Sequence, residues 1–498
     1  MAKLDELTTQ GKLRAYYLGA VVCIGGFLFG YDSGIIGGVL TLSSFQRDFR
    51  YTAKQNTRVS SLAVSLQNLG AFVSCFVVFP LTRRYGRKKA IVCSSMLFCI
   101  GALMQTIDHH SLTVFYIFRV IAGLGLGASS VIVPMYSSEM VPKQLRGQIG
   151  SFYQLLFTAG IFLSYWVNYG VSKDLPSSTA RQWQIPVGLQ LLPAGILGLG
   201  VLTLRESTRW LTLQGRHDEA WASLVWIRAD SGPAVAAEME EIRAGVLLEQ
   251  RATEGFRISE LVTVSANLKR ISLAFLVFTA QQATGATAFA YYSPQYFALI
   301  VGKGNDRALL LSGIFGAVKV VACGLFIIFV AERVPRKAIL TGGAVFMAAT
   351  QFVTAAVLKT HPAPGGGRVT SSGIATVAMI YLFVVAYNFS WGPLCWPYVS
   401  EIFSARIREP GIAVGVSAQW LFSFVFTLVT PYMIQDLGWG TFLFWGIADL
   451  VIAVGAWLIL IETRGRSLED ISGTVVDGVN SKLIDDEGEG SGEGTKRS

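Results

Sequence analysis

The stretch YSSEMVPKQLRG, residues 136–147, returns later in the chain as YVSEIFSARIRE, residues 398–409. A tyrosine, a serine, a glutamate and an arginine recur at one common offset of 262 residues, in the pairs 136/398, 138/400, 139/401 and 146/408. Tyrosine, glutamate and arginine at matched spacing indicate a duplicated structural unit. The sequence therefore predicts two halves built on one plan.

Two further pairs of segments support the duplication. RRYGRKK at 83–89 is echoed by ERVPRKA at 332–338, and RESTRWL at 205–211 is echoed by IETRGRSL at 461–468. The three pairs follow one another in the same order in each half. Since chance does not readily produce matching order, each half is expected to hold the same sequence of helices.

Composition places the chain in a membrane. Hydrophobic residues make up 52% of the 498 residues and charged residues only 15%, whereas soluble proteins usually carry about 25% charged residues. Twelve apolar segments are each long enough to cross a hydrocarbon core of about 30 Å as a helix. These predicted spans are 15–40, 59–80, 90–107, 112–140, 148–170, 184–204, 270–300, 308–330, 338–358, 373–400, 411–434 and 439–461.

The net charge of +9 reflects topology rather than nucleic-acid binding. Most lysines and arginines fall in the segments on the side that holds the N-terminus, which the positive-inside rule places in the cytoplasm. With twelve spans both termini lie on that side. The four histidines show no metal-ligand spacing and no catalytic motif stands out, so neither an enzyme nor a bound cofactor is expected.

These features divide the chain into five parts. A cytoplasmic tail, 1–14, precedes a first six-helix half, 15–204, and a polar segment, 205–268, whose apolar spacing predicts a cytoplasmic helical linker. The second six-helix half covers 269–461. The last segment, 462–498, contains DDEGEGSGEG and is expected to be a largely disordered cytoplasmic tail.

Four charged residues lie deep within the predicted spans: Asp32, Arg119, Lys319 and Asp449. An ionised Asp at a bilayer's centre costs about 2.5–3.5 kcal/mol on insertion scales. Asp32 and Arg119 lie at similar depth, so they are candidates for a pair. One interpretation is a structural ion pair. The other is a proton site, in which Asp32 gains and loses its arginine partner as the protein changes shape.

The sequence resembles the sugar porter family of the major facilitator superfamily, most closely its fungal proton-coupled monosaccharide transporters. The resemblance covers roughly 15–470 and rests on FGYDSGIIGGV (29–39), RVIAGLGLG (119–127), QQATGATAFAYYSP (281–294) and WGPLCWPYVSEIF (391–403), besides the repeated segments. It implies an all-α membrane fold of twelve helices in two pseudo-symmetric halves. It also implies that Asp32 accepts the proton and Arg119 partners it, protons being the coupling ion.

The resemblance also implies which residues bind substrate. Gln154, Gln281, Gln282 and Trp396 match the family's sugar contacts, while Thr287 and Gln419 stand where the family usually has asparagine. Amides donate to and accept from hydroxyls, and an aromatic face suits the C–H side of a sugar ring. Adjacent glutamines point about 100° apart on a helix, so one of Gln281 and Gln282 is expected to face the site. Tyr291 and Tyr292 match the outer gate.

A charge network at the cytoplasmic ends matches the family's inner gate. It comprises Arg84, Glu139, Arg146, Glu332, Arg333, Glu401 and Arg408. Arg83 replaces the family's aspartate and Pro335 replaces a glycine, so one part of this network is altered.

Lys319 is compatible with either a neutral or an anionic substrate. It could contact an anionic substrate, or it could pair with Asp449 or backbone carbonyls; we expect the second. The leading functional hypothesis is a plasma-membrane proton/monosaccharide symporter that works as a monomer by alternating access. The alternatives are a transporter of a sugar acid or quinate-like carboxylate and a non-transporting sugar sensor. The expected partners are a small sugar and the lipid bilayer, with no nucleic acid.

Overall fold

The computed structural model describes residues 8–107, 109–302, 305–330, 334–362, 370–403 and 406–462. Every element in these ranges is helical. Of the two predicted tails, residues 1–7 and 463–498 fall outside the described residues, while residues 9–14 form the start of the first helix. Helices of 20 to 31 residues dominate, and at 1.5 Å per residue such helices match the thickness of a bilayer core.

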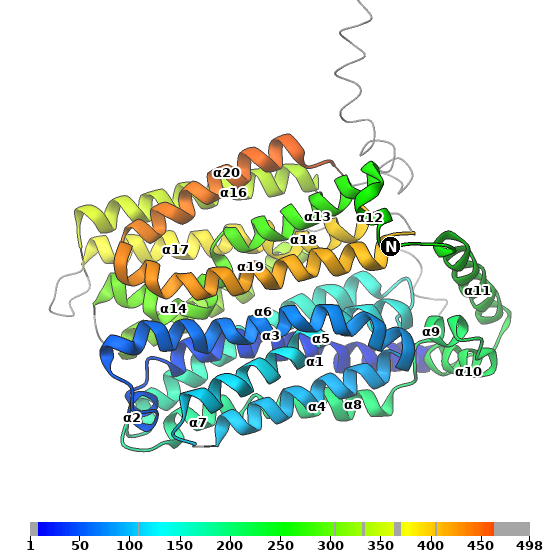
Figure 1. The fold of residues 1–498 in the computed structure, drawn as a ribbon, viewed down its shortest axis with the longest axis horizontal. Coiled ribbons are helices and arrows are strands. Elements are labelled where there is room, and N and C mark those ends of the chain that lie inside the picture. Colours follow the sequence, from blue (N-terminus) through cyan, green and yellow to red (C-terminus); the bar gives the residue numbers. More distant parts are fainter. Residues whose placement is uncertain are drawn as a thin grey trace, which may run out of the picture.

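The first half occupies the lower bundle in Figure 1, coloured blue to green. Its long helices are α1 (Thr9–Val39), α3 (Asn56–Tyr85), α4 (Arg87–Thr106), α5 (Leu112–Met140) and α6 (Arg146–Asp174). The sixth predicted span is the pair α7 (Arg181–Gly188) and α8 (Leu191–Thr203). The short α2 (Ser43–Asp48) and a 3-10 turn, Ala53–Gln55, connect α1 to α3.

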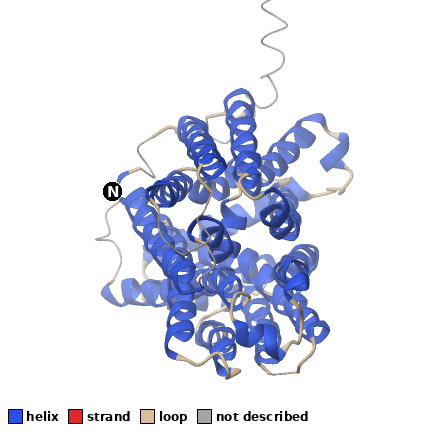
Figure 2. Ribbon diagram, turned by 90° about the vertical axis from the view of Figure 1, so that its left-hand side faces the viewer, coloured by secondary structure: helices blue, strands red, loops and turns tan. Residues whose placement is uncertain are grey.

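The second half forms the upper bundle, coloured green to orange. Its spans are α13 (Ser265–Ala283) with α14 (Ala286–Val301), α15 (Asn305–Phe329), α16 (Arg336–Thr360), α17 (Ser371–Phe389) with α18 (Trp391–Glu401), α19 (Arg408–Leu437) and α20 (Gly440–Ile459). Figure 2 views the helices end-on and shows the two bundles one above the other.

The seventh predicted span is broken within the bundle. Eleven helical stretches of the described chain are each long and apolar enough to cross a membrane, and the twelfth crossing is the pair α13 and α14. The break lies at Gly285, whose φ of +78° favours glycine. A Cβ there would lie 2.5 Å from the Trp445 ring, so the close packing also requires glycine.

Four helices of the linker mark one end of the molecule: α9 (Thr208–Leu213), α10 (His217–Arg228), α11 (Pro233–Thr253) and α12 (Glu260–Thr263). They lie at the right of Figure 1, and this end is called the linker face. The opposite end, which carries α2 and α7, is called the far face. The described chain begins and ends near the linker face, as an even number of crossings requires.

The glycines of α1 permit close helix packing. A Cβ on Gly30 would lie 1.8 Å from the Phe157 carbonyl oxygen, and one on Gly34 would lie 2.0 Å from the Ser164 hydroxyl, both on α6. On another face of α1, a Cβ on Gly37 would lie 1.9 Å from the Tyr291 carbonyl oxygen on α14. Small residues thus let α1 contact its own half and the other half at backbone distance.

Candidate transport site

A cavity of about 1320 Å³ lies between the two halves. Its walls come from α1, α5 and α6 of the first half and from α13 to α19 of the second. Towards the linker face the lining continues to Glu238 and Glu241 on α11. The cavity therefore runs from the middle of the bundle to the linker face.

Towards the far face the halves are sealed by hydrogen bonds. The Tyr291 hydroxyl on α14 donates to Asn68 Oδ1 on α3 at 3.2 Å, and Asn68 Nδ2 donates to Thr427 Oγ1 on α19 at 3.0 Å. The Tyr292 hydroxyl lies 2.8 Å from the Thr427 carbonyl oxygen and 3.3 Å from that of Ser60. Both predicted gate tyrosines are buried in this seal.

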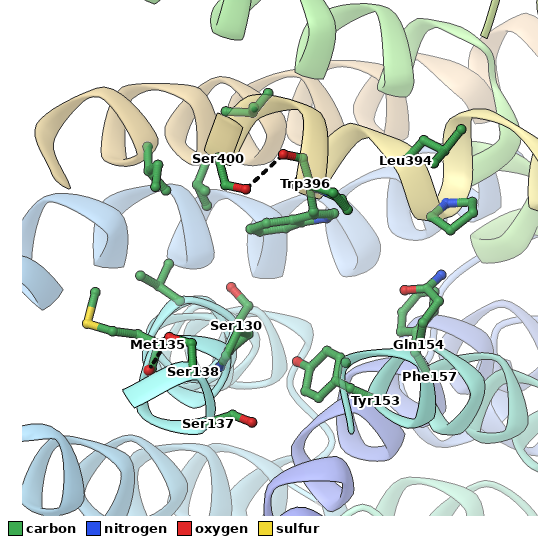
Figure 3. Close-up of a pocket in the computed structure, with 18 of the residues that line it drawn as sticks. Ser130, Met135, Ser137, Ser138, Tyr153, Gln154, Phe157, Leu394, Trp396 and Ser400 are labelled. Carbon is green, nitrogen blue, oxygen red and sulfur yellow. Dashed lines mark hydrogen bonds between the residues drawn. The ribbon is translucent and has the colours of Figure 1, made fainter. Parts of the chain in front are cut away.

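All six predicted substrate contacts line the cavity: Gln154, Gln281, Gln282, Thr287, Trp396 and Gln419. Figure 3 shows Trp396 and Gln154 on opposite sides of the gap between the halves. The expectation that only one of the two adjacent glutamines faces the site is wrong, because both Gln281 and Gln282, near the end of α13, line the cavity.

Several polar atoms of the cavity wall have no partner in the described structure. The side-chain oxygens of Gln281, Gln282 and Gln419 accept no hydrogen bond, and the indole N–H of Trp420 donates none. Gln281 is nevertheless held in place, because its Nε2 donates to the Trp391 carbonyl oxygen at 2.9 Å. Amide oxygens without a donor are suited to ligand hydroxyls.

Lys319 on α15 reaches the same cavity with only 4% of its surface exposed. Its Nζ lies 5.5 Å from the centre of the Phe157 ring on α6 and 5.9 Å from that of Tyr387 on α17. Lys319 makes these two cation–π contacts and, among the described residues, no ion pair with a carboxylate.

The predicted pairing of Lys319 with Asp449 is therefore wrong. Asp449 on α20 is fully buried, and neither of its carboxyl oxygens has a hydrogen-bond partner within the described ranges. It does not line the cavity, since α20 packs on the other side of the second half, against α16. The alternative, donation from Lys319 to backbone carbonyls, is likewise not observed among described residues.

Asp32 and Arg119 form a buried cluster beside the cavity. Arg119 Nη1 on α5 lies 3.4 Å from Asp32 Oδ1, and both residues are fully buried. Arg119 Nε donates to the Ala63 carbonyl oxygen at 2.7 Å. Gln67 on α3 donates its amide to the other carboxylate oxygen of Asp32. The sequence pattern did not single out Gln67, although a glutamine within an apolar span is itself a signal of a functional position.

At the linker face the repeated segments form equivalent ion pairs. Arg87 pairs with Glu139 at 2.9 Å in the first half, and Arg336 pairs with Glu401 in the second. A second acid caps each adjoining helix: Glu206 accepts from the Arg87 backbone N–H at 3.0 Å, and Glu462 accepts from that of Arg336 at 3.0 Å. A carboxylate at a helix N-terminus is stabilised by the unsatisfied N–H groups and the dipole.

The place given to Arg84 in this network is wrong. Arg84 is exposed and its guanidinium lies over the Tyr85 ring at 5.4 Å, whereas Arg87 contacts Glu139. The turn at Gly86, with φ of +95°, separates the two arginines onto different helices. Arg146 donates to the Val141 carbonyl oxygen at 3.0 Å, and Arg408 lines the cavity mouth. Glu332 and Arg333 lie outside the described residues.

The linker contacts both halves around the mouth. On α11, Glu241 pairs with Lys143 of the first half, and Glu249 pairs with Arg209 on α9 of the linker itself. Arg406 of the second half contacts Glu260 at 2.9 Å, and this hydrogen bond holds the pKa of the Glu260 carboxyl below its usual value. Among the described residues these ion pairs leave the mouth open between the halves.

Two helical bundles around one central cavity, open at one end and sealed at the other, define a membrane transporter of the major facilitator type. The family model "Sugar (and other) transporter" matches residues 18–474. The chain belongs to this family of transporters, as the sequence pattern predicted.

Named relatives and solved structures agree with this assignment. The chain is 34% identical to the probable quinate permease of Aspergillus clavatus, over 92% of this chain and 87% of the relative. It is 32% identical to the quinate permease of Emericella nidulans, over 92% and 88%. The xylose transporter XylE from E. coli, in a partially occluded inward-open conformation, matches with a TM-score of 0.77 at 24% identity, over 91% of this chain and 100% of that one. This match confirms the twelve-helix fold.

Proposed function

We propose that this transporter carries a small, polyhydroxylated carboxylate of the quinate type, together with a proton. The observation that carries the proposal is the ammonium of Lys319, which lies buried in the cavity wall without a carboxylate among the described residues. Burying a charge without a counter-charge is costly. A carboxylate on the substrate supplies that counter-charge while it is bound.

The rest of the wall suits a hydroxylated ring. Three amide oxygens without donors, on Gln281, Gln282 and Gln419, can accept from ligand hydroxyls. Trp396 offers an aromatic face across the gap from Gln154. The wall therefore combines one cation with several groups that accept hydrogen bonds. The names of the relatives, quinate permeases, describe a substrate with both features.

A neutral monosaccharide is the second candidate, and it was the leading hypothesis from the sequence. The glutamines and the tryptophan of the lining can bind a neutral sugar as well as a hydroxylated acid. A neutral substrate requires no role for Lys319 beyond its two aromatic contacts. The unpaired position of Lys319 now favours the acid, because the partner that made the lysine structural, Asp449, is elsewhere.

Asp32 is the proposed proton site. In this conformation it is fully buried and bonded to Arg119 and Gln67, while the adjacent Ser33 lines the cavity. Protonation of Asp32 would remove the counter-charge of Arg119. We assign the linker face to the cytoplasm of a plasma-membrane protein. The proton and the substrate would then leave the cavity on that side. Alternating access would then exchange the far-face seal for closure at the linker face.

The two candidate substrates differ in the charge that they move. One proton with a neutral sugar carries one positive charge inward, and that movement is worth about 2.3 kcal/mol per 100 mV. One proton with one monocarboxylate carries no net charge. With the same proton stoichiometry, the acid is therefore accumulated by the pH gradient and is insensitive to the membrane potential.

The test combines uptake and charge movement. Purified protein in liposomes receives labelled quinate, shikimate, D-xylose, D-glucose and myo-inositol under an inward proton gradient, with the membrane potential clamped at zero or at −100 mV. We expect quinate-type acids to be preferred and their accumulation to be unaffected by potential. Preference for a neutral sugar, with a potential-dependent accumulation, would contradict the acid and support the second candidate.

A further inference from the structure

Gln67 has a place in the Asp32 cluster that a simple ion pair does not require. It lies on α3, is 1% exposed, and donates its Nε2 to the carboxylate oxygen of Asp32 that Arg119 does not contact. Its own side-chain oxygen has no hydrogen-bond partner in the described structure. A buried acceptor without a donor is costly, so an amide retained here needs a reason.

Protonation changes what Asp32 needs from its neighbours. A carboxylate only accepts hydrogen bonds, whereas a carboxylic acid must also donate one. Arg119 has donors only and cannot receive that proton. The nearby Ala63 carbonyl oxygen is already used by Arg119 Nε at 2.7 Å. Among the described side chains around Asp32, the acceptor without a hydrogen-bond partner is the oxygen of Gln67, which a half-turn of the amide exchanges with Nε2.

We infer that Gln67 is a positioning residue for the coupling proton. Its amide donates to Asp32 when the carboxyl is charged and accepts from it when the carboxyl is protonated. Both states of a fully buried acid are then hydrogen-bonded, and the proton binds and leaves the same oxygen atom without a change in partner. The inference rests on the proposed proton coupling at Asp32.

The other titratable groups facing this cluster do not replace Gln67. Arg119 approaches from α5, and Tyr291 and Tyr292 approach from α14. The Tyr291 hydroxyl donates to Asn68 and that of Tyr292 to backbone oxygens in the far-face seal. On α6, the Tyr165 hydroxyl donates to the Ala290 carbonyl oxygen at 2.5 Å. Each of these hydroxyls donates to another acceptor, and none of them is hydrogen-bonded to Asp32 among the described residues.

Replacement of Gln67 by methionine keeps the volume and removes both functions. Hydrogen bonds to a charged group are roughly twice as strong as neutral ones, so the charged form of Asp32 loses more than the protonated form. We expect the pH at which uptake is half-maximal to rise by about one unit, which corresponds to about a tenfold change in proton occupancy.

The measurement uses the full-length protein in liposomes containing a pH-sensitive dye. Uptake of labelled quinate and of D-xylose is recorded across a series of external pH values, together with the protons that enter per substrate. Gln67→Asn, whose amide is one methylene shorter, is the second variant and should shift the midpoint in the same direction. It keeps the question answerable if Gln67→Met fails to insert.

Two controls separate this role from a packing defect. Gln351→Met removes a buried glutamine from α16 in the other half, whose Nε2 also has no partner in the described ranges, and should leave the midpoint in place. In an Asp32→Asn background, Gln67→Met should no longer alter the pH profile of substrate exchange, because the titrating group is gone.

The outcomes separate this inference from the proposed function. A wild-type midpoint in well-expressed Gln67→Met or Gln67→Asn protein overturns the inference and leaves proton coupling intact. An equal shift in Gln351→Met also overturns it. If wild-type protein carries both probes with no proton entry, the proposed coupling fails and the role of Gln67 fails with it.

Discussion

Arg119 and Lys319 are the two cations buried deepest between the described helices, and they are treated in opposite ways. Arg119, in the first half, contacts Asp32 and the Ala63 carbonyl oxygen. Lys319, in the second half, lies against the rings of Phe157 and Tyr387 and lines the cavity. One cation has its counter-charge within the protein, and the other has none in the described structure.

This difference between the two cations indicates that they have different roles, one in coupling and one in substrate binding. A paired ion in a low-dielectric site changes state only when its partner is protonated or moved, which suits an ion that is coupled to conformation. An unpaired cation at a cavity wall is completed by a ligand of opposite charge. The ring of Phe157, which contacts Lys319, belongs to the first half. The substrate site is therefore shared, while the proton cluster lies within the first half.

The largest effect is expected from Asp32→Asn, which breaks the paired side of this comparison. Concentrative uptake should be lost entirely, while exchange of labelled for unlabelled substrate persists, because no group remains to bind the coupling proton. Accumulation and exchange in liposomes measure the two. Asp449→Asn is the matched control, since Asp449 is an equally buried aspartate outside the cavity. Accumulation with proton entry in Asp32→Asn protein would remove Asp32 from the mechanism.

Lys319→Met tests the unpaired side. Leaving a bound carboxylate without its cation costs about 3–5 kcal/mol, so the apparent affinity for a quinate-type acid should fall by roughly a hundredfold or more. Uptake of a neutral sugar should be retained. Lys359→Met is the control, because Lys359 also lies over an aromatic ring, that of Trp439 at 4.7 Å, but outside the cavity. Equal loss for acid and sugar would make Lys319 structural.

The fold was predictable because its signals are local and repeated. Hydropathy located the crossings, and the repeat at 136–147 and 398–409 placed them in two halves. The breaks within crossings were not predicted. The predicted span 270–300 contains Gly285, and only the folded structure, through the backbone turn at Gly285 and the packing of Trp445 against it, shows that the helix stops there. Hydropathy averages over such a position.

The sequence predicted the depth of the site residues in the membrane but not the direction in which their side chains point. Counting residues from the helix ends placed Asp32 and Arg119 at one level, and they are in contact. The same count put Lys319 and Asp449 within their spans but did not show that α20 carries Asp449 away from the cavity. Arg84 and Arg87 lie three residues apart, and the turn at Gly86 decides which one reaches Glu139.

A moderate effect is expected from Gln282→Ala, which removes a neutral hydrogen-bonding group from the cavity wall and leaves the charge of Lys319 in place. Removal of one hydrogen-bonding group from a buried site costs about 1–3 kcal/mol, so affinity should fall by roughly tenfold to a hundredfold for acid and sugar alike. Equilibrium binding of labelled substrate gives this value. Gln351→Ala, outside the cavity, should bind as wild type does. Unchanged affinity in Gln282→Ala would place the substrate elsewhere.

The smallest effect is expected from Thr287→Asn, which sharpens the comparison because it changes the cavity wall and leaves both buried cations in place. Thr287 lines the cavity and is hydrogen-bonded to Tyr387, whose ring lies 5.9 Å from Lys319 Nζ. Asparagine restores the amide that sugar porters usually have here and should shift preference among neutral polyols about fivefold, the worth of one hydrogen bond of about 1 kcal/mol.

The ratio of acid to neutral uptake should change much less than in Lys319→Met, since the cation remains in place. Competition of each polyol against labelled quinate measures both quantities in one experiment. Thr287→Ser, which keeps the hydroxyl, should preserve the wild-type order of preference. If Thr287→Asn instead abolishes the preference for acids while Lys319→Met spares it, selectivity lies in the hydroxyl pattern of the wall. The unpaired cation would then be a feature of helix packing alone.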